Sequence, residues 1–223
     1  MIGRATVRFR EIRGHNVLAT NHTEMHGFSS NGECRSGLEG YALPAALSGM
    51  THDYAALLQV ILDGYTLSPH GYHGVVHWAR VLENGHAVAQ ENGADHEVVT
   101  LFALFHDARR VNDDYDPGHG MRGGDLAHSL RGSLIHLDDR RFDLLYEACR
   151  RHTDGETEAD ATIQACWDAD RLDLGRVGIT PVPHLLCTET ARRIVPWAHE
   201  RARRNHVPDA LITQWRWEAN PSR

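Results

Sequence analysis

The segment LFALFHD, residues 101–107, constrains the fold more than any other part of this chain. Five apolar residues lead directly into His106 and Asp107, so the segment carries this polar pair into the interior. An ionised carboxylate buried without a partner is very costly, and proteins pair it, neutralise it or use it to coordinate a metal. The fold must therefore bring a partner to Asp107.

Helical patterns fill the chain from residue 50 onward. Apolar residues recur every three to four positions, Asp95 is a suitable helix cap, and no stretch alternates as a strand would. We predict a polar loop at 112–124. We also predict an all-α fold with helices at about residues 51–64, 73–90, 95–107, 124–136, 139–152, 158–171, 188–205 and 208–218.

The first 49 residues have a different character. They are rich in Gly, Ser and Asn and show no sustained period, which is typical of loops or disorder. We predict that residues 1–49 are an N-terminal extension and that residues 50–223 form the helical domain, with Met50 as the natural start. The alternative is an arm that packs on the domain or on a partner.

Composition narrows the classes of partner. No apolar run approaches the roughly 18 residues of a membrane span, and no signal-peptide core is present at the N-terminus. The four cysteines are scattered without a CxxC pair, which favours a reducing compartment. The net charge of −7 argues against nucleic acid as a partner. We expect a cytoplasmic protein with no membrane partner.

Two matches to known motifs are not convincing, one because of its context and one because a residue is missing. GHGMRG, residues 118–123, fits GxGxxG, but it follows DDYDP rather than a strand. HEVVT, residues 96–100, begins like the zinc motif HExxH but has Thr100 where the second histidine is needed. Neither indicates a nucleotide fold or a metalloprotease.

One set of polar residues is more informative. His77, His106, Asp107 and Asp170 lie on apolar segments of three different predicted helices. Asp170 shares the apolar face of its helix, whereas Asp168, two positions earlier, points to the other side. Two imidazoles and two carboxylates suit a divalent transition metal and leave coordination positions open. We therefore predict that the partner of Asp107 is a metal ion.

The order of these ligands resembles a known family. HWARV, LFALFHD and DADRLDLGRVG resemble motifs of the HD-domain superfamily of metal-dependent phosphohydrolases, and the resemblance spans about residues 50–190. It implies a helical bundle with a central metal and hydrolysis of a phosphate ester, commonly of a nucleotide. The closest likeness is to uncharacterised HD-domain proteins, so the substrate is not implied.

The chain departs from nucleotidase-like HD proteins after the HD pair. Those proteins carry an acidic residue there that serves the attacking water, whereas this chain has Arg109 and Arg110. We expect the carboxylate for that role to come from Asp113, Asp114 or Asp116. No HD-GYP signature is present, which argues against cleavage of cyclic di-GMP.

Four further residues are candidates for the reaction. His119 and His152 fall where some HD proteins place additional histidines, for a second metal or for the substrate phosphate. We expect His119 to face the open side of the metal, as a proton donor or as a ligand to a second ion. Arg110 and Arg122 are expected to contact phosphoryl oxygens through bidentate hydrogen bonds.

The sequence thus predicts a metal-dependent phosphohydrolase that acts on a small phosphorylated molecule, a nucleotide or a related phosphomonoester. The ion is Mn, Fe, Co, Ni, Mg or Zn, with a second ion as an option, and the oligomeric state is left open. One alternative is a di-iron oxygenase, which would need His152 and either His119 or His128 as ligands. Another is a non-catalytic module that binds a nucleotide.

Overall fold

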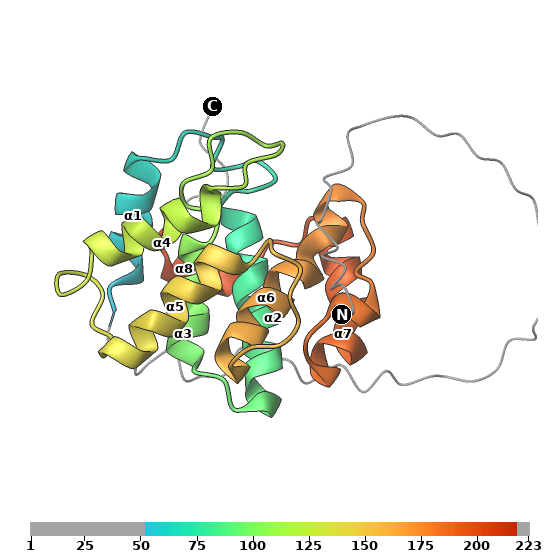
Figure 1. Ribbon diagram of the computed structural model, residues 1–223. Coiled ribbons are helices and arrows are strands. Elements are labelled where there is room, and N and C mark those ends of the chain that lie inside the picture. The colour runs from blue at the N-terminus through green and yellow to red at the C-terminus, as the bar shows by residue number, and fades with distance from the viewer. Residues whose placement is uncertain (1–51, 218–223) are drawn as a thin grey trace, which may run out of the picture.

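The computed structural model describes residues 52–217, so the expected extension at 1–49 lies outside the described residues (Figure 1). Within 52–217 the chain forms α-helices and short 3-10 helices and no strand, which confirms the all-α prediction. The elements are α1 (Tyr54–Asp63), α2 (Val75–Asn92), α3 (His96–Phe105), α4 (His119–Ser129), α5 (Asp139–Arg151), α6 (Ala161–Leu172), η2 (Asp173–Val177), η3 (Pro183–Leu185), α7 (Glu189–Arg203) and α8 (Asp209–Gln214).

Side-chain caps define where several helices begin. The Asp95 carboxylate accepts hydrogen bonds from the backbone N–H groups of Glu97 and Val98, as the sequence predicts. Asp138 and Asp160 cap α5 and α6 in the same way. Such caps satisfy N–H groups that have no partner inside the helix, and each contributes about 1 kcal/mol.

Helix α2 is the centre of the bundle. It packs against α6 on one side and α3 on another, while α5 lies against α3 and α6 (Figure 1). The core between these helices contains fully buried aromatic side chains, among them Trp78 of α2, Phe102 of α3 and Trp167 of α6. The packing therefore brings the three helices that carry the candidate ligands into direct contact.

The segment after the HD pair differs from the prediction. Residues 119–124 belong to α4, which begins at His119 and ends at Ser129, whereas the sequence indicates a loop at 112–124 and a helix at 124–136. The glycines of this segment serve close packing rather than turns. A Cβ at Gly120 would collide with the Cys149 carbonyl oxygen, and one at Gly123 with the Phe105 carbonyl oxygen.

This correction matters for the site. Glycine is a poor helix former, so a Gly-rich stretch is typical of a loop, but here the close approach to α3 and α5 outweighs propensity. His119 consequently projects from the first turn of a helix that packs on both the HD segment and α5.

None of the helices in residues 52–217 combines the length and the hydropathy that a membrane-spanning helix needs.

Candidate metal centre

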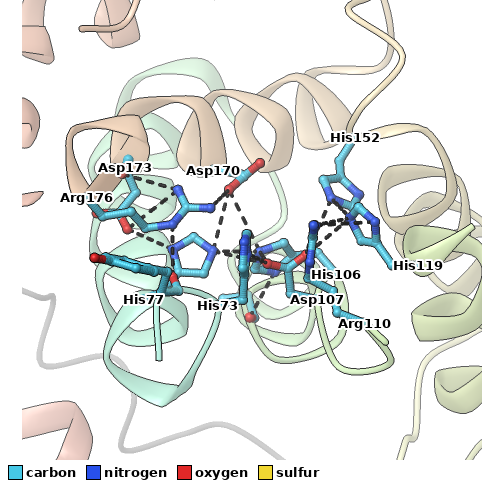
Figure 2. Close-up of polar contacts among 12 residues, drawn as sticks. His73, His77, His106, Asp107, Arg110, His119, His152, Asp170, Asp173 and Arg176 are labelled. Atoms are coloured by element: carbon cyan, nitrogen blue, oxygen red, sulfur yellow. Dashed lines mark hydrogen bonds and ion pairs between the residues drawn. The ribbon is translucent and has the colours of Figure 1, made fainter. Parts of the chain in front are cut away.

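The four predicted ligands converge in the interior of the bundle (Figure 2). His77 projects from the first turn of α2, Asp170 from the last turn of α6, and His106 and Asp107 follow the end of α3. The Nε2 atoms of His77 and His106 are 3.1 Å apart. This group of four side chains is called the HD cluster below.

The two carboxylates of the HD cluster face the same pair of nitrogens. Asp107 Oδ2 is 3.6 Å from His77 Nε2 and 3.7 Å from His106 Nε2. Asp170 Oδ1 is 3.6 Å and 3.9 Å from the same two atoms. Two nitrogens and two oxygens therefore surround one small volume.

Hydrogen bonds on the far side of each ring determine where its proton lies. His77 Nδ1 donates to Asp173 Oδ2 at 2.7 Å. His106 Nδ1 lies 3.2 Å and 3.1 Å from the backbone carbonyl oxygens of Phe102 and Ala103, both of which can only accept. In a neutral imidazole the other nitrogen then carries a lone pair, so both Nε2 atoms present lone pairs to each other and to two carboxylates.

The surroundings of His106 and Asp170 favour the ionisation states that metal binding requires. Burial lowers the pKa of His106 to about 3, so the ring is neutral. Burial alone would raise the pKa of Asp170, but Arg176 and the neighbouring His106 hold it below its usual value. Imidazole nitrogens and carboxylate oxygens gathered in this way have the chemistry of a divalent transition-metal site.

A second group of possible ligands shares Asp107. Asp107 Oδ1 is 3.2 Å from His119 Nε2 and 3.8 Å from His152 Nε2, and these two nitrogens are 2.9 Å apart. His152 Nδ1 donates to the Cys149 carbonyl oxygen at 2.7 Å, and His119 Nδ1 donates to the Asp116 carbonyl oxygen. A second small volume is thus surrounded by one possible ligand atom from each of Asp107, His119 and His152.

Comparison with known proteins identifies the fold. No family model matches the chain, and no curated protein matches it. Among solved structures, a predicted HD superfamily hydrolase from an uncultured Thermotogales bacterium matches with a TM-score of 0.52 and 24% identity. The match covers 72% of this chain and 91% of that one. This chain has the HD-superfamily fold.

This is the fold that the three sequence motifs indicate, so the expected likeness to the HD-domain superfamily is confirmed for the fold. Arg80 lies one turn after His77 in α2. Its Nε donates to Asp173 Oδ1 at 2.7 Å, and Asp173 in turn accepts a hydrogen bond from His77.

Arg110 and Arg122 occupy different surroundings in this HD fold. Arg110 is buried, with Nη1 3.6 Å from Asp107 Oδ1 and 3.2 Å from His119 Nε2, and it also donates to the Asp114 carbonyl oxygen. Arg122 instead pairs with Asp116 Oδ2 at 2.5 Å. Together with Arg109, both line an open surface pocket of about 390 Å³. The structure thus brings Arg110, but not Arg122, to the carboxylate of the HD pair.

The acidic residues after the HD pair are not placed as expected. Asp113 and Asp114 are exposed. The Asp116 carboxylate is occupied by Arg122 and by the backbone N–H of Val111. The structure therefore brings none of these three carboxylates into the HD cluster.

Asp168 lies where the helical-face argument puts it, away from the HD cluster. It accepts hydrogen bonds from the backbone N–H groups of Cys187 and Thr188 and from the Thr188 hydroxyl, at 2.7–2.8 Å. Asp168 thus anchors the start of α7. Its role is structural.

Three residues of the centre are not singled out by the sequence. His73 Nδ1 lies 2.8 Å from Asp107 Oδ2, Asp173 joins His77 to Arg80, and Arg176 Nη2 is 3.8 Å from Asp170 Oδ1. Each lies within one turn or a short loop of a motif, in HGYHGVVH or DADRLDLGRVG. The excess of polar residues close to the ligands is the signal that could have identified them.

Proposed function

We propose that this chain is a metal-dependent phosphohydrolase that acts on a small phosphate ester, a nucleotide or a related phosphomonoester. His77, His106, Asp107 and Asp170 would hold the first divalent ion. The observation that carries the proposal is the pair of histidine Nε2 atoms, 3.1 Å apart, that faces an oxygen of each of two carboxylates. Buried carboxylates gathered in this way need a partner, and a divalent cation would supply one.

We propose His119, His152 and Asp107 as ligands of a second ion. The hydrogen bond from His119 Nδ1 to the Asp116 carbonyl oxygen leaves its Nε2 without a proton to give. Arg110 Nη1, which can only donate, also faces this Nε2 atom. Both contacts support the role of ligand for His119 rather than that of proton donor.

A divalent ion in such a centre lowers the pKa of its bound water and polarises a phosphoryl oxygen. Hydrolysis adds one water molecule across the ester P–O bond, so that phosphate and an alcohol are released. The chain's own part is to orient the ligands and to offset charge. Asp173 orients His77 through the 2.7 Å hydrogen bond, and Arg110 places a positive charge beside Asp107.

A metal-by-substrate screen tests this proposal. Protein reconstituted separately with Mn, Fe, Co, Ni, Mg or Zn is assayed for phosphate release from nucleotides and from simple phosphomonoesters. Release that depends on a metal, and that disappears in His77→Ala and Asp170→Ala, is the expected result. Tight nucleotide binding without turnover in any metal would instead support a non-catalytic module.

A variant of His119 separates the two proposed ions. His119→Ala should keep the first ion, because His119 touches none of the side chains of the HD cluster except Asp107. It should lose the second ion and reduce phosphate release by about 100-fold, the size of effect that loss of a catalytic group commonly has. Elemental analysis of the variant beside the wild type measures the first effect independently of turnover.

One observation favours a second candidate, a di-iron oxygenase. That reaction needs two adjacent ions, and Asp107 has one carboxylate oxygen directed at each group of histidines. A coloured, iron-loaded protein that consumes dioxygen and releases no phosphate would favour the oxygenase. Phosphate release from colourless protein would exclude it.

A further inference from the structure

The side chains of the HD cluster, of the second group of histidines and of their neighbours differ in how much of their surface reaches solvent. The side chains of His77, His106, Asp107, His119 and His152 are at most 3% exposed. In contrast, Asp170 is 17% exposed, His73 is 11% exposed and Arg176 is 8% exposed. These three side chains are the more exposed ones among those named, and this side of the centre is called the mouth below.

Arg176 is oriented by the backbone around the mouth. Its Nε donates to the Tyr72 carbonyl oxygen at 3.0 Å, and its Nη1 donates to the Asp173 carbonyl oxygen at 3.2 Å. Its Nη2 makes no hydrogen bond to any residue in the described part of the chain and lies 3.8 Å from Asp170 Oδ1 (Figure 2). A guanidinium held in this way has donors directed toward the centre at no further cost in side-chain entropy.

Two residues next to Arg176, one in space and one in the chain, have exposed apolar side chains. Tyr72, whose carbonyl oxygen Arg176 holds, is 64% exposed, and Val177, the next residue after Arg176, is 44% exposed. The Tyr72 ring makes no aromatic contact with another described residue. Exposed apolar groups beside a charged donor are typical of ligand sites, where the apolar surface binds the organic part and the donor fixes orientation.

Arg110 and Arg176 differ in which of their nitrogen donors already make hydrogen bonds. Arg110 is nearer to Asp107, but two of its three nitrogens donate to the carbonyl oxygens of Asn112 and Asp114, and the side chain is buried. Arg110 can offset charge beside Asp107, whereas the Nη2 atom of Arg176 has donors that make no hydrogen bond within the described part of the chain and that can bind a phosphate group.

We infer that Arg176 binds the phosphate group of the substrate and that Tyr72 and Val177 contact a planar ring in its organic part. The substrate class is therefore a phosphomonoester that carries an aromatic or heteroaromatic group. This inference rests on the proposed function for the existence of a phosphorylated substrate, and it adds the residues and the selectivity.

Binding of two phosphonates that cannot be hydrolysed tests the inference without turnover. Calorimetry on manganese-loaded protein compares phenylphosphonate with methylphosphonate. The wild type should bind phenylphosphonate about 5-fold more tightly, in the range expected for contact between two aromatic rings. Tyr72→Ala should abolish this preference and leave the affinity for methylphosphonate unchanged. Tyr115→Ala, which removes a comparably exposed tyrosine from the loop after the HD pair, should keep the preference.

A second variant tests the phosphate contact. Arg176→Gln should weaken both phosphonates by about 10-fold or more, as expected for the loss of a charge-assisted hydrogen bond. Arg176→Lys keeps the charge and should recover part of the affinity, which also covers the case in which Arg176→Gln does not fold. Arg140→Gln removes the same charge from an exposed position on α5 and should have no effect. Manganese content, measured on each variant, should stay at the wild-type level.

The outcomes separate this inference from the proposed function. Equal affinity of the wild type for the two phosphonates, or an equal loss in Tyr115→Ala and Tyr72→Ala, would overturn the role of Tyr72. Equal affinities in Arg176→Gln and the wild type would overturn the role of Arg176. If phosphonate binding depends on both residues but no ester is hydrolysed in any metal, the inference stands and the proposed hydrolase activity fails.

Discussion

Substitution of Asp173 tests whether the hydrogen bond behind His77 positions it for a metal. Asp173 Oδ2 accepts from His77 Nδ1 at 2.7 Å and from Arg80 Nη2 at 3.1 Å, and Oδ1 accepts from Arg80 Nε at 2.7 Å. Asp173→Asn keeps the size of the side chain but leaves one oxygen for these three donors. Its amide nitrogen would face either Arg80, which can only donate, or His77 Nδ1, whose proton would then have to move to Nε2.

The structure sets the expected magnitudes. Removal of a carboxylate that orients a metal-bound histidine commonly weakens metal affinity by about 10- to 100-fold, which corresponds to ~1.4–2.7 kcal/mol. The metal-free protein should also lose about 2–3 kcal/mol of stability, because a charged hydrogen bond to the buried Arg80 is lost. Arg80 keeps its hydrogen bonds to the Asn205 side chain and the His206 carbonyl oxygen, which limits the loss.

Asp168→Asn is the matched control. Asp168 is likewise a buried carboxylate near the end of α6, but its three hydrogen bonds go to Cys187 and Thr188. The Asp168→Asn substitution should lower the stability of the metal-free protein and leave the metal affinity unchanged. Urea unfolding measures stability, and competition with a chelator measures affinity. Equal metal affinity in Asp173→Asn and the wild type, or equal losses in both variants, would refute the reasoning.

Three further predictions concern the two aspartates of α6, the N-terminal segment and the buried His86. Asp170→Ala should abolish binding of the first ion, whereas Asp168→Ala should keep it, as elemental analysis of both proteins will show. A chain that begins at residue 50 should fold and bind metal like the full chain, and loss of solubility or of metal would contradict this. Burial lowers the pKa of His86 to about 4. The unfolded chain therefore takes up this proton near pH 6.5 and the folded protein only near pH 4, so the free energy of unfolding decreases as the pH falls from about 6.5 toward 4. The slope should reach ~1.4 kcal/mol per pH unit for this one group, and urea unfolding should give a smaller slope in His86→Gln.

The four candidate ligands could be selected from the sequence because the relevant information is local. Apolar spacing determines which face of a helix is buried, so Asp170 and Asp168 could be separated without a structure. The five apolar residues before His106 and Asp107 likewise required that this pair be inside. The all-helical class followed from the same periodicity.

The course of the chain after the HD pair could not be predicted in this way. Glycine-rich sequence indicates a loop, and only the contact of Gly120 and Gly123 with the backbones of α5 and α3 explains why a helix forms there. That helix places His119 beside His152 and Asp107. The expected phosphate contact of Arg122 rests on the loop and stays a prediction, and in the structure the Arg122 guanidinium pairs with Asp116.

Burial and the helical face of each candidate ligand can be read from the order of residues, because these properties depend on periods of three to four residues. Which polar groups meet depends on how the helices pack. Asp173 joins His77 to Arg80, and Arg176 reaches the backbone of Tyr72, because α2 packs against α6 and η2. Hydrogen bonds and charges act over a few ångströms in space, so contacts between segments about a hundred residues apart leave no periodic signal in the chain.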